Sequence, residues 1–125
     1  MTLMFLNGGA MHGGPLHHLL CDAPLLGEVR TAARYRFYSV GDRFPALEEV
    51  SSGGVEISGE VYDVRMEVLR ESLLPAEPPE LELGVIELAD GRPSLAMVLR
   101  REFAAHTGLK DISATGGWRA YRGER

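Results

Sequence analysis

Short apolar segments alternate with glycine, proline and Asp-Gly breaks along the whole chain, and this pattern limits the possible folds more than any other feature. The longest apolar runs, such as residues 95–99, have the length of a strand and fall far short of the roughly 20 residues of a membrane span. Residues 31–40 and 54–64 show the period of two that is typical of half-buried strands. In the second segment Val61 lies on one side, and Glu60 and Tyr62 lie on the other.

The order of the segments predicts a single α+β domain over residues 1–125, because a chain of this length allows one domain and hardly two. The segments expected to form strands are residues 3–6, 31–40, 54–64, 83–88 and 94–99. The segments expected to form short helices are residues 16–20, 63–74 and 101–106, the second capped by Asp63. Residues 41–45 and the Asp90-Gly91 pair are expected to form turns. We expect a small, curved, largely antiparallel mixed sheet or barrel with short flanking helices.

Composition and charge argue against several classes of function. The chain has 13 basic and 18 acidic side chains, a net charge of −5, whereas non-specific nucleic-acid binding needs a basic surface. The single Cys21 excludes a disulfide framework within the chain and a Cys-x-x-Cys site, so we expect it to be a small core residue. The apolar start carries no lysine or arginine and breaks at residues 7–9, unlike a signal peptide. A cytoplasmic protein is therefore expected.

Basic side chains are concentrated near the end of the chain. Residues 1–91 contain 6 basic and 15 acidic side chains, whereas residues 92–125 contain 7 basic and 3 acidic ones. The basic residues of the second segment are spaced apart, unlike those of a polyanion-binding tail. We therefore expect the C-terminal segment to lie across a more acidic body.

The most distinctive local motif is a glycine-rich loop at Asn7–Gly14, with four glycines in eight residues, followed by Pro15 at the start of a short helix. Glycines allow neighbouring backbone N–H groups to point into one concave nest, which binds a carboxylate or a developing oxyanion. The loop lacks the Lys-Ser/Thr of a P-loop and does not fit Gly-x-Gly-x-x-Gly. The two interpretations are a nest for a small carboxylate and a tight connection that binds nothing.

Three of the four histidines, His12, His17 and His18, fall within seven residues. His17 and His18 are adjacent and would point apart on a helix, so the cluster does not favour a metal site. No metal and no organic cofactor is expected. His12 or His17 could instead act as a general base, and the alternative is that at least two of the three are surface or packing residues.

Three glutamates, Glu77, Glu80 and Glu82, crowd an extended proline-containing segment before a predicted strand. Alternation along the chain places Glu80 and Glu82 on the same side. Two carboxylates on one face can raise the pKa of one of them, which would provide a general base near neutral pH. A solvated face of charged side chains is the simpler alternative.

Several segments together resemble the C-terminal domain of allophanate hydrolases, within the gamma-glutamylcyclotransferase-like or AIG2-like superfamily. The resemblance covers nearly the whole chain, and its most distinctive part is the Gly116-Gly117-Trp118-Arg119-x-Tyr121 motif. Residues 5–13 resemble the strand-and-loop signature of the superfamily, with Asn7 where tyrosine is common. The other matching segments are residues 13–18, 30–38, 54–62, 83–91 and 111–121.

The resemblance implies a pocket lined by the glycine loop. The substrate-binding residues that it implies are Asn7, Gly8, Gly9, Ala10, Met11 and Tyr38. In the cyclotransferases a single glutamate moves the proton while the loop holds a small amino-acid substrate. In allophanate hydrolase the related domain is associated with decarboxylation of an N-carboxylated product, and a loop histidine is implicated. Ala10 occupies that histidine position here, so the residues expected to be catalytic are Glu82, Glu80 and His12.

Two hypotheses of function remain open. The first is an enzyme that acts by general acid/base chemistry on a small carboxylated, ureido or amino-acid-derived substrate, as a decarboxylase-like lyase or a gamma-glutamyl-cyclotransferase-like transferase. The second is a non-catalytic binding module or a partner subunit of an amidase. A homodimer is also left open, and neither nucleic acid nor membrane is expected among the partners.

Overall fold

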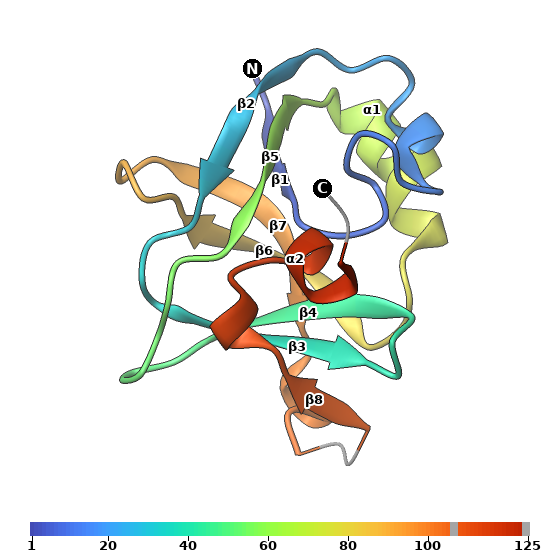
Figure 1. Ribbon diagram of the computed structural model, residues 1–125. Helices are drawn as coiled ribbons and strands as arrows, with labels where there is room; N and C mark the ends of the chain where they lie inside the picture. Colours follow the sequence, from blue (N-terminus) through green and yellow to red (C-terminus); the bar gives the residue numbers. More distant parts are fainter. Residues whose placement is uncertain (106–107, 124–125) are drawn as a thin grey trace.

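Two β-sheets form the framework of the computed structural model, which describes residues 1–105 and 108–123 (Figure 1). The larger sheet has five strands in the order β2-β5-β1-β7-β6, and the smaller has three in the order β4-β3-β8. Neighbouring strands run antiparallel except β1 and β7, which are parallel. The strands are β1 (Leu3–Leu6), β2 (Leu25–Arg30), β3 (Tyr35–Val40), β4 (Phe44–Glu49), β5 (Ser58–Asp63), β6 (Leu81–Glu87), β7 (Pro93–Leu99) and β8 (Leu109–Asp111). The predicted α+β class with a largely antiparallel mixed sheet is confirmed.

The hairpin of β6 and β7 forms where apolar segments flank the Asp-Gly pair. Its register runs from Leu81 opposite Leu99 to Glu87 opposite Pro93. Gly91 in the turn has a φ of +90°, a left-handed conformation that glycine adopts without a steric penalty. The prediction of this hairpin is confirmed, and β6 begins two residues earlier than expected.

Three strands, β2, β4 and the short β8, are absent from the sequence prediction. β2 lies at the edge of its sheet and most of its residues are exposed, so it lacks the alternation of a half-buried strand. β4 begins shortly after Gly41 and Asp42, both of which have a positive φ. The predicted turn at residues 41–45 is therefore too long, because Phe44 and Pro45 already belong to β4.

The two outer strands of the larger sheet meet at one point. Thr31, which follows β2, forms an antiparallel bridge with Leu88, which follows β6. The Ala89 N–H donates to the Arg30 carbonyl at 2.9 Å. Thr31 thus belongs to this bridge, and the strand predicted there begins later, at Tyr35. The contact curves the sheet, but the described strands form no closed barrel.

All helices in the described part of the chain are short, and none combines the length and apolar character that a membrane-spanning helix requires. They are η1 (His17–Leu20), α1 (Met66–Val68), η2 (Leu69–Leu73), η3 (Leu74–Ala76), η4 (Arg101–Phe103), η5 (Ser113–Thr115) and α2 (Trp118–Arg122). The helix predicted at residues 63–74 begins three residues late, and Asp63 does not cap it, because its carboxylate accepts the Thr2 N–H at 3.0 Å. The helix predicted at residues 101–106 is shorter, and its last residue lies outside the described residues.

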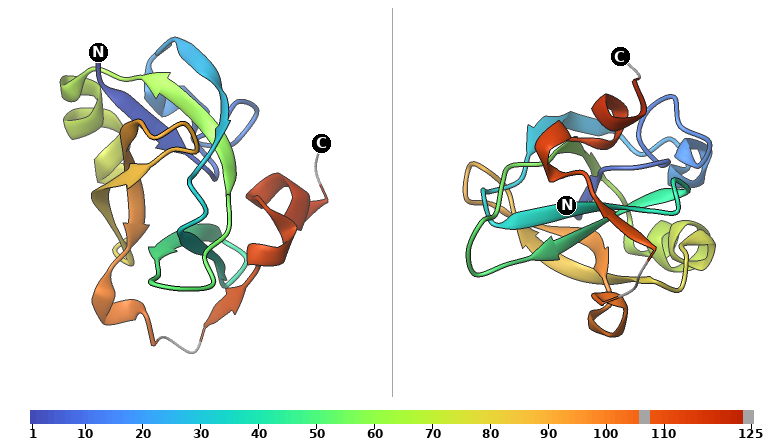
Figure 2. Two further views of the ribbon diagram at one scale, coloured as in Figure 1. Left: turned by 90° about the vertical axis from the view of Figure 1, so that its left-hand side faces the viewer. Right: turned by 60° about the horizontal axis from the view of Figure 1, so that its bottom comes forward.

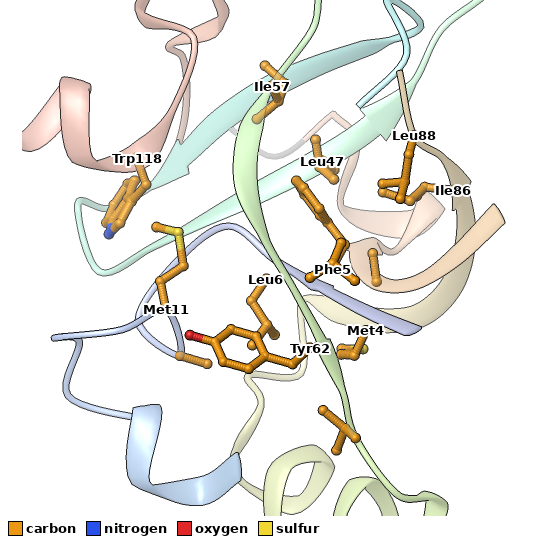
Figure 3. Close-up of a cluster of buried hydrophobic side chains, with 14 of the residues drawn as sticks. Met4, Phe5, Leu6, Met11, Leu47, Ile57, Tyr62, Ile86, Leu88 and Trp118 are labelled. Carbon is orange, nitrogen blue, oxygen red and sulfur yellow. The ribbon is translucent and has the colours of Figure 1, made fainter. Parts of the chain in front are cut away.

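The main hydrophobic core lies against β1 and β5, where Phe5 and Tyr62 occupy neighbouring strands (Figure 3). β5 is buried on both faces from residue 59 to residue 62, so Glu60 lies inside the molecule. Gly59 is required here, because a Cβ atom on it would lie 2.4 Å from Cζ of Phe5. The strand predicted at residues 54–64 is observed only over Ser58–Asp63. Its polar side is buried at Glu60 and Tyr62, whereas Ser58 is exposed.

The C-terminal segment begins with β8, the edge strand of the smaller sheet, and continues through η5 to α2 (Figures 1 and 2). Trp118 anchors it in the core and is 6% exposed. Arg119 on α2 forms an ion pair with Glu60 at 3.2 Å, and Arg100 at the end of β7 pairs with Glu82 at 3.3 Å. These contacts confirm that basic groups near the end of the chain pack against a more acidic body.

Cys21 is not the core residue that the sequence predicts. It is exposed and follows η1 in a left-handed conformation with a φ of 53°. Its Sγ lies 3.7 Å from the Leu19 carbonyl oxygen and 3.8 Å from the Ser72 hydroxyl. The chain reverses at this point, which turns the short side chain outwards.

Candidate functional site

The glycine-rich loop is folded tightly on itself by backbone hydrogen bonds. The Met11 N–H donates to the Gly8 carbonyl at 3.1 Å, which closes a turn. The Leu16 N–H donates to the Gly9 carbonyl at 2.9 Å. A Cβ atom on Gly14 would lie 2.2 Å from the Gly9 carbonyl oxygen, so this close approach requires glycine. The backbone path of the loop therefore requires glycine at this position.

The N–H groups of Gly9 and Ala10 lie at the centre of this turn. Among the described residues neither N–H has a hydrogen-bond partner. The Ala10 carbonyl, in contrast, lies 3.0 Å from Nδ1 of His17. The turn therefore has two N–H groups that are free to donate, whereas the Ala10 carbonyl, which would repel an anion, is bonded to His17.

A pocket of about 310 Å³ opens beside this loop. Three arginines from two segments line it: Arg43 between β3 and β4, and Arg119 and Arg122 on α2. None of the described lining residues carries a carboxylate, although the whole chain has a net charge of −5. The lining residues are Gly8, Gly9, Met11, His12, Gly13, Gly14, Pro15, Arg43, Trp118, Arg119 and Arg122. Guanidinium groups beside free N–H groups favour a small anion.

A buried carboxylate joins the loop to α2. Glu60 on β5 is 3% exposed, and its Oε1 accepts the His12 N–H at 2.8 Å and the Tyr62 hydroxyl at 2.9 Å. Its Oε2 lies 3.2 Å from Nη2 of Arg119, which also donates to the His12 carbonyl at 2.6 Å. Burial, followed by the hydrogen bond and the charge of Glu60, raises the pKa of Tyr62 to about 12, so its hydroxyl remains a donor.

The three clustered histidines have different surroundings. His12 is exposed and lines the pocket. His17 lies on η1, with its ring centre 5.4 Å from that of His12 and 5.6 Å from that of Tyr62. Because a carbonyl only accepts, Nδ1 of His17 carries the proton that bonds Ala10. His18 is exposed, and no group of three or more His, Cys, Asp or Glu in the described part could hold a metal ion.

The carboxylates expected to be catalytic lie outside the pocket lining. Oε2 of Glu80 is 3.5 Å from Nη2 of Arg43, so Glu80 reaches the pocket through that arginine. Oε1 of Glu80 is buried and has no hydrogen-bond partner among the described residues. Glu82 on β6 pairs with Arg100 and lines a separate groove of about 260 Å³. The structure thus brings Glu80, but not Glu82, next to a residue of the pocket.

Only some of the residues expected to bind substrate line the pocket. Gly8, Gly9 and Met11 line the pocket, whereas Asn7 and Ala10 are adjacent to them in the chain but are not lining residues. Tyr38 lies on β3, outside the pocket, and its hydroxyl donates to Glu48 at 3.0 Å. Burial and this glutamate raise the pKa of Tyr38 to about 12.

Four residues of the site are missing from the sequence prediction: Glu60, Arg43, Arg119 and Arg122. Their type alone gives no signal, since charged side chains are usually solvated. The excess of basic residues near the end of the chain is the one usable indication, because it predicts that C-terminal arginines contact the body. It does not indicate which acidic residue they meet.

A larger cleft of about 680 Å³ lies on the other side of the C-terminal segment. Met11, Trp118 and Arg119 line both cavities and separate them. The cleft contains charges of both signs, and its Arg30 and Glu56 lie 3.7 Å apart. It therefore lacks the one-sided charge of the loop pocket.

Replacing Glu77 by glutamine should raise the free energy of unfolding by roughly 1–3 kcal/mol at about pH 8 and leave it unchanged near pH 4. Burial raises the pKa of Glu77 from 4.5 to about 7 in the folded protein. The folded state therefore holds this proton more tightly, and wild-type stability is lost as the pH rises from about 4.5 through about 7. Urea unfolding at both pH values measures the difference. The same gain at both would show that the Glu77 carboxyl is not the cause.

Comparison with known proteins gives one consistent result. A family model described as the allophanate hydrolase C-terminal domain matches residues 2–123. The urea amidolyase of Saccharomyces cerevisiae is 28% identical in an alignment of 121 residues, and the match covers 91% of this chain and 6% of that protein. The chain therefore spans only a small part of this relative.

Solved structures are similar over almost the whole chain. A uropathogenic E. coli-specific protein is 32% identical, with a TM-score of 0.91 and coverage of 99% of this chain and 97% of that one. An allophanate hydrolase of Kluyveromyces lactis is 27% identical, with a TM-score of 0.89 and coverage of 98% of this chain and 21% of that one. An AIG2-like protein of Mus musculus shows the same fold, with 21% identity and a TM-score of 0.65. That match covers 86% of this chain and 82% of the mouse chain.

Proposed function

This chain belongs to the family of allophanate hydrolase C-terminal domains, and on that premise we propose that it is an enzyme acting on a small carboxylated, ureido or amino-acid-derived substrate. The observation that carries the proposal is the pocket in which a glycine loop faces three arginines and no carboxylate among the described lining residues. Fold alone does not transfer an activity, so the proposal depends on this site.

Two kinds of group would hold the anionic part of the substrate. The free N–H group of Gly9, which lines the pocket, suits a carboxylate or an oxyanion that develops during the reaction. The side chain of Arg43 is 63% exposed and lines the pocket, where its guanidinium can bind an incoming carboxylate. Binding by both kinds of group would fix the orientation of the substrate.

His12 is the group we assign to proton transfer. Among the three side chains expected to be catalytic, His12 lines the pocket, whereas Glu80 and Glu82 do not. An imidazole can both donate and accept a proton, so His12 could transfer one to or from a substrate held on the loop. Glu80 would act indirectly, by keeping Arg43 in place at 3.5 Å. General acid/base chemistry of this kind fits both a decarboxylase-like and a cyclotransferase-like reaction.

The first experiment is a ligand screen by thermal shift with malonate, allophanate, biuret, small ureido acids and glutamyl dipeptides, followed by NMR for turnover. A ligand that binds the folded state raises the melting temperature by an amount that grows with the ratio of its concentration to its Kd. A compound that is bound and consumed supports the enzyme and selects between the two reaction types. If none of the panel binds, the proposed substrate class is wrong.

Replacing Arg43 by glutamine should weaken malonate binding by roughly three- to tenfold, because one charge-assisted contact to the anion is lost. Arg101, an exposed arginine that lines the separate groove beside Glu82, provides the matched control. Isothermal titration of wild type, Arg43→Gln and Arg101→Gln measures the three affinities. An equal loss in both variants would indicate a general effect of net charge and would remove Arg43 from the site.

A second candidate function is a non-catalytic module that works with an amidase. It is favoured by the length of the relatives, since the chain corresponds to 6% of a urea amidolyase and 21% of an allophanate hydrolase. A ligand that binds in the screen and stays intact would support this candidate over the enzyme.

A further inference from the structure

Glu60 is the only charged side chain among the buried residues that the structure describes. It does not line the loop pocket, yet its carboxylate contacts two residues that do, His12 and Arg119. The structure assigns to Glu60 a positioning role: it holds the glycine loop and Arg119 in the arrangement that forms the anion pocket. This inference rests on the proposed function of that pocket.

The contacts of Glu60 end on groups that set the shape of the pocket. The His12 N–H donates to Oε1 at 2.8 Å, so the carboxylate fixes the backbone directly after the turn of the loop. Nη2 of Arg119 is held between Oε2 of Glu60 at 3.2 Å and the His12 carbonyl at 2.6 Å. The loop and α2 are thereby tied to the same carboxylate, and neither can shift without breaking a bond to it.

A purely structural role explains these contacts less well. Burying a carboxylate opposes folding, and an apolar side chain of similar size often stabilises a core as well as a buried ion pair does. An apolar residue could not accept the His12 N–H or orient the guanidinium of Arg119. The carboxylate supplies directional bonds to both walls of the pocket, and the Tyr62 hydroxyl at 2.9 Å fixes the direction of Oε1.

Two substitutions separate the bonds. Glu60→Gln keeps an oxygen that can accept the His12 N–H but removes the charge that pairs with Arg119, whereas Glu60→Ala removes both contacts. Leu99→Ala is the control for general destabilisation, because Leu99 is 7% exposed and lies in the smaller, separate hydrophobic cluster. Amide exchange at His12 measures the hold on the loop, and titration with malonate measures the pocket.

We expect the exchange rate of the His12 amide to rise roughly tenfold or more in Glu60→Ala, because the charge-assisted bond from the His12 N–H is lost. In Glu60→Gln the rate should rise only a few-fold, because the amide oxygen can still accept this bond. Malonate affinity should fall in the same order, and Leu99→Ala should change neither quantity. Equal exchange at His12 in Glu60→Ala and in wild type would overturn the positioning role. If wild type does not bind malonate, the proposed function fails at that point, while the exchange data still test the hold on the loop.

Discussion

Replacing Gly59 by alanine is expected to destabilise the fold by about 3 kcal/mol or more, the upper range for overpacking, because the added methyl group has no space to occupy. A Cβ atom at this position would lie 2.4 Å from Cζ of Phe5 and 2.5 Å from the Leu6 carbonyl oxygen. Phe5 is 1% exposed and is packed against β5 (Figure 3), so neither its ring nor the backbone of β1 can move aside easily. Urea unfolding gives the free energy directly.

Gly27 on the adjacent strand β2 provides the matched control. No atom lies within 4 Å of a Cβ built on Gly27, so Gly27→Ala should stay within about 0.5 kcal/mol of wild type. A similar loss in both variants would show that the cost arises from the strand conformation and not from contact with Phe5. Since Gly59 directly precedes Glu60, a backbone shift in Gly59→Ala should also displace the carboxylate from the loop.

Local patterns predict the parts of the fold that depend on neighbouring residues. The Asp-Gly turn predicts the hairpin of β6 and β7, and the break after Leu6 predicts the end of β1. The pairing of β3 with β8 has no such signal, because Tyr38 pairs with Asp111 far along the chain. β2 is equally hidden, since an exposed edge strand needs no apolar alternation.

In the candidate site, too, the sequence predicts the residues that are neighbours in the chain and misses those that meet only in the fold. The glycine loop is visible in the sequence because its residues are contiguous. Glu60 is not, because its partners His12 and Arg119 are 48 and 59 residues away. A period of two places Glu60 on the polar side of its strand, but the loop and α2 cover that side. A polar face becomes an interior only through these long-range contacts, which one sequence does not reveal.

The arrangement also explains why an acidic protein can present a basic pocket. Two acidic side chains pair with pocket arginines from outside the lining: Glu60 is buried next to Arg119, and Glu80 lies beside Arg43. Each carboxylate orients a guanidinium without lining the pocket itself. The positive groups that face the cavity are thus held by negative groups outside it, and this favours an anionic ligand.

Replacing Arg119 by methionine is expected to destabilise the protein by about 3–5 kcal/mol, because it leaves the Glu60 carboxylate buried without its cation. Methionine keeps the apolar stem of the arginine, so most of the loss should come from the charge. Arg122→Met, on the same helix, is the control. The exposed Arg122 guanidinium lies 5.5 Å from the centre of the Trp118 ring and donates to the Asp42 carbonyl at 3.4 Å. Arg122 makes its contacts at the surface, so its replacement should cost no more than about 1 kcal/mol.

Urea unfolding followed by the fluorescence of Trp118, the single tryptophan, measures these variants on the helix that carries both arginines. The double variant Glu60→Gln/Arg119→Met should regain at least half of the loss, since glutamine leaves no unpaired charge in the interior. If the double variant is no more stable than Arg119→Met, the loss arises from packing and not from the stranded carboxylate. If Arg119→Met costs no more than Arg122→Met, Glu60 does not need Arg119, and the tie between the loop and α2 would have to rest on the His12 contacts alone.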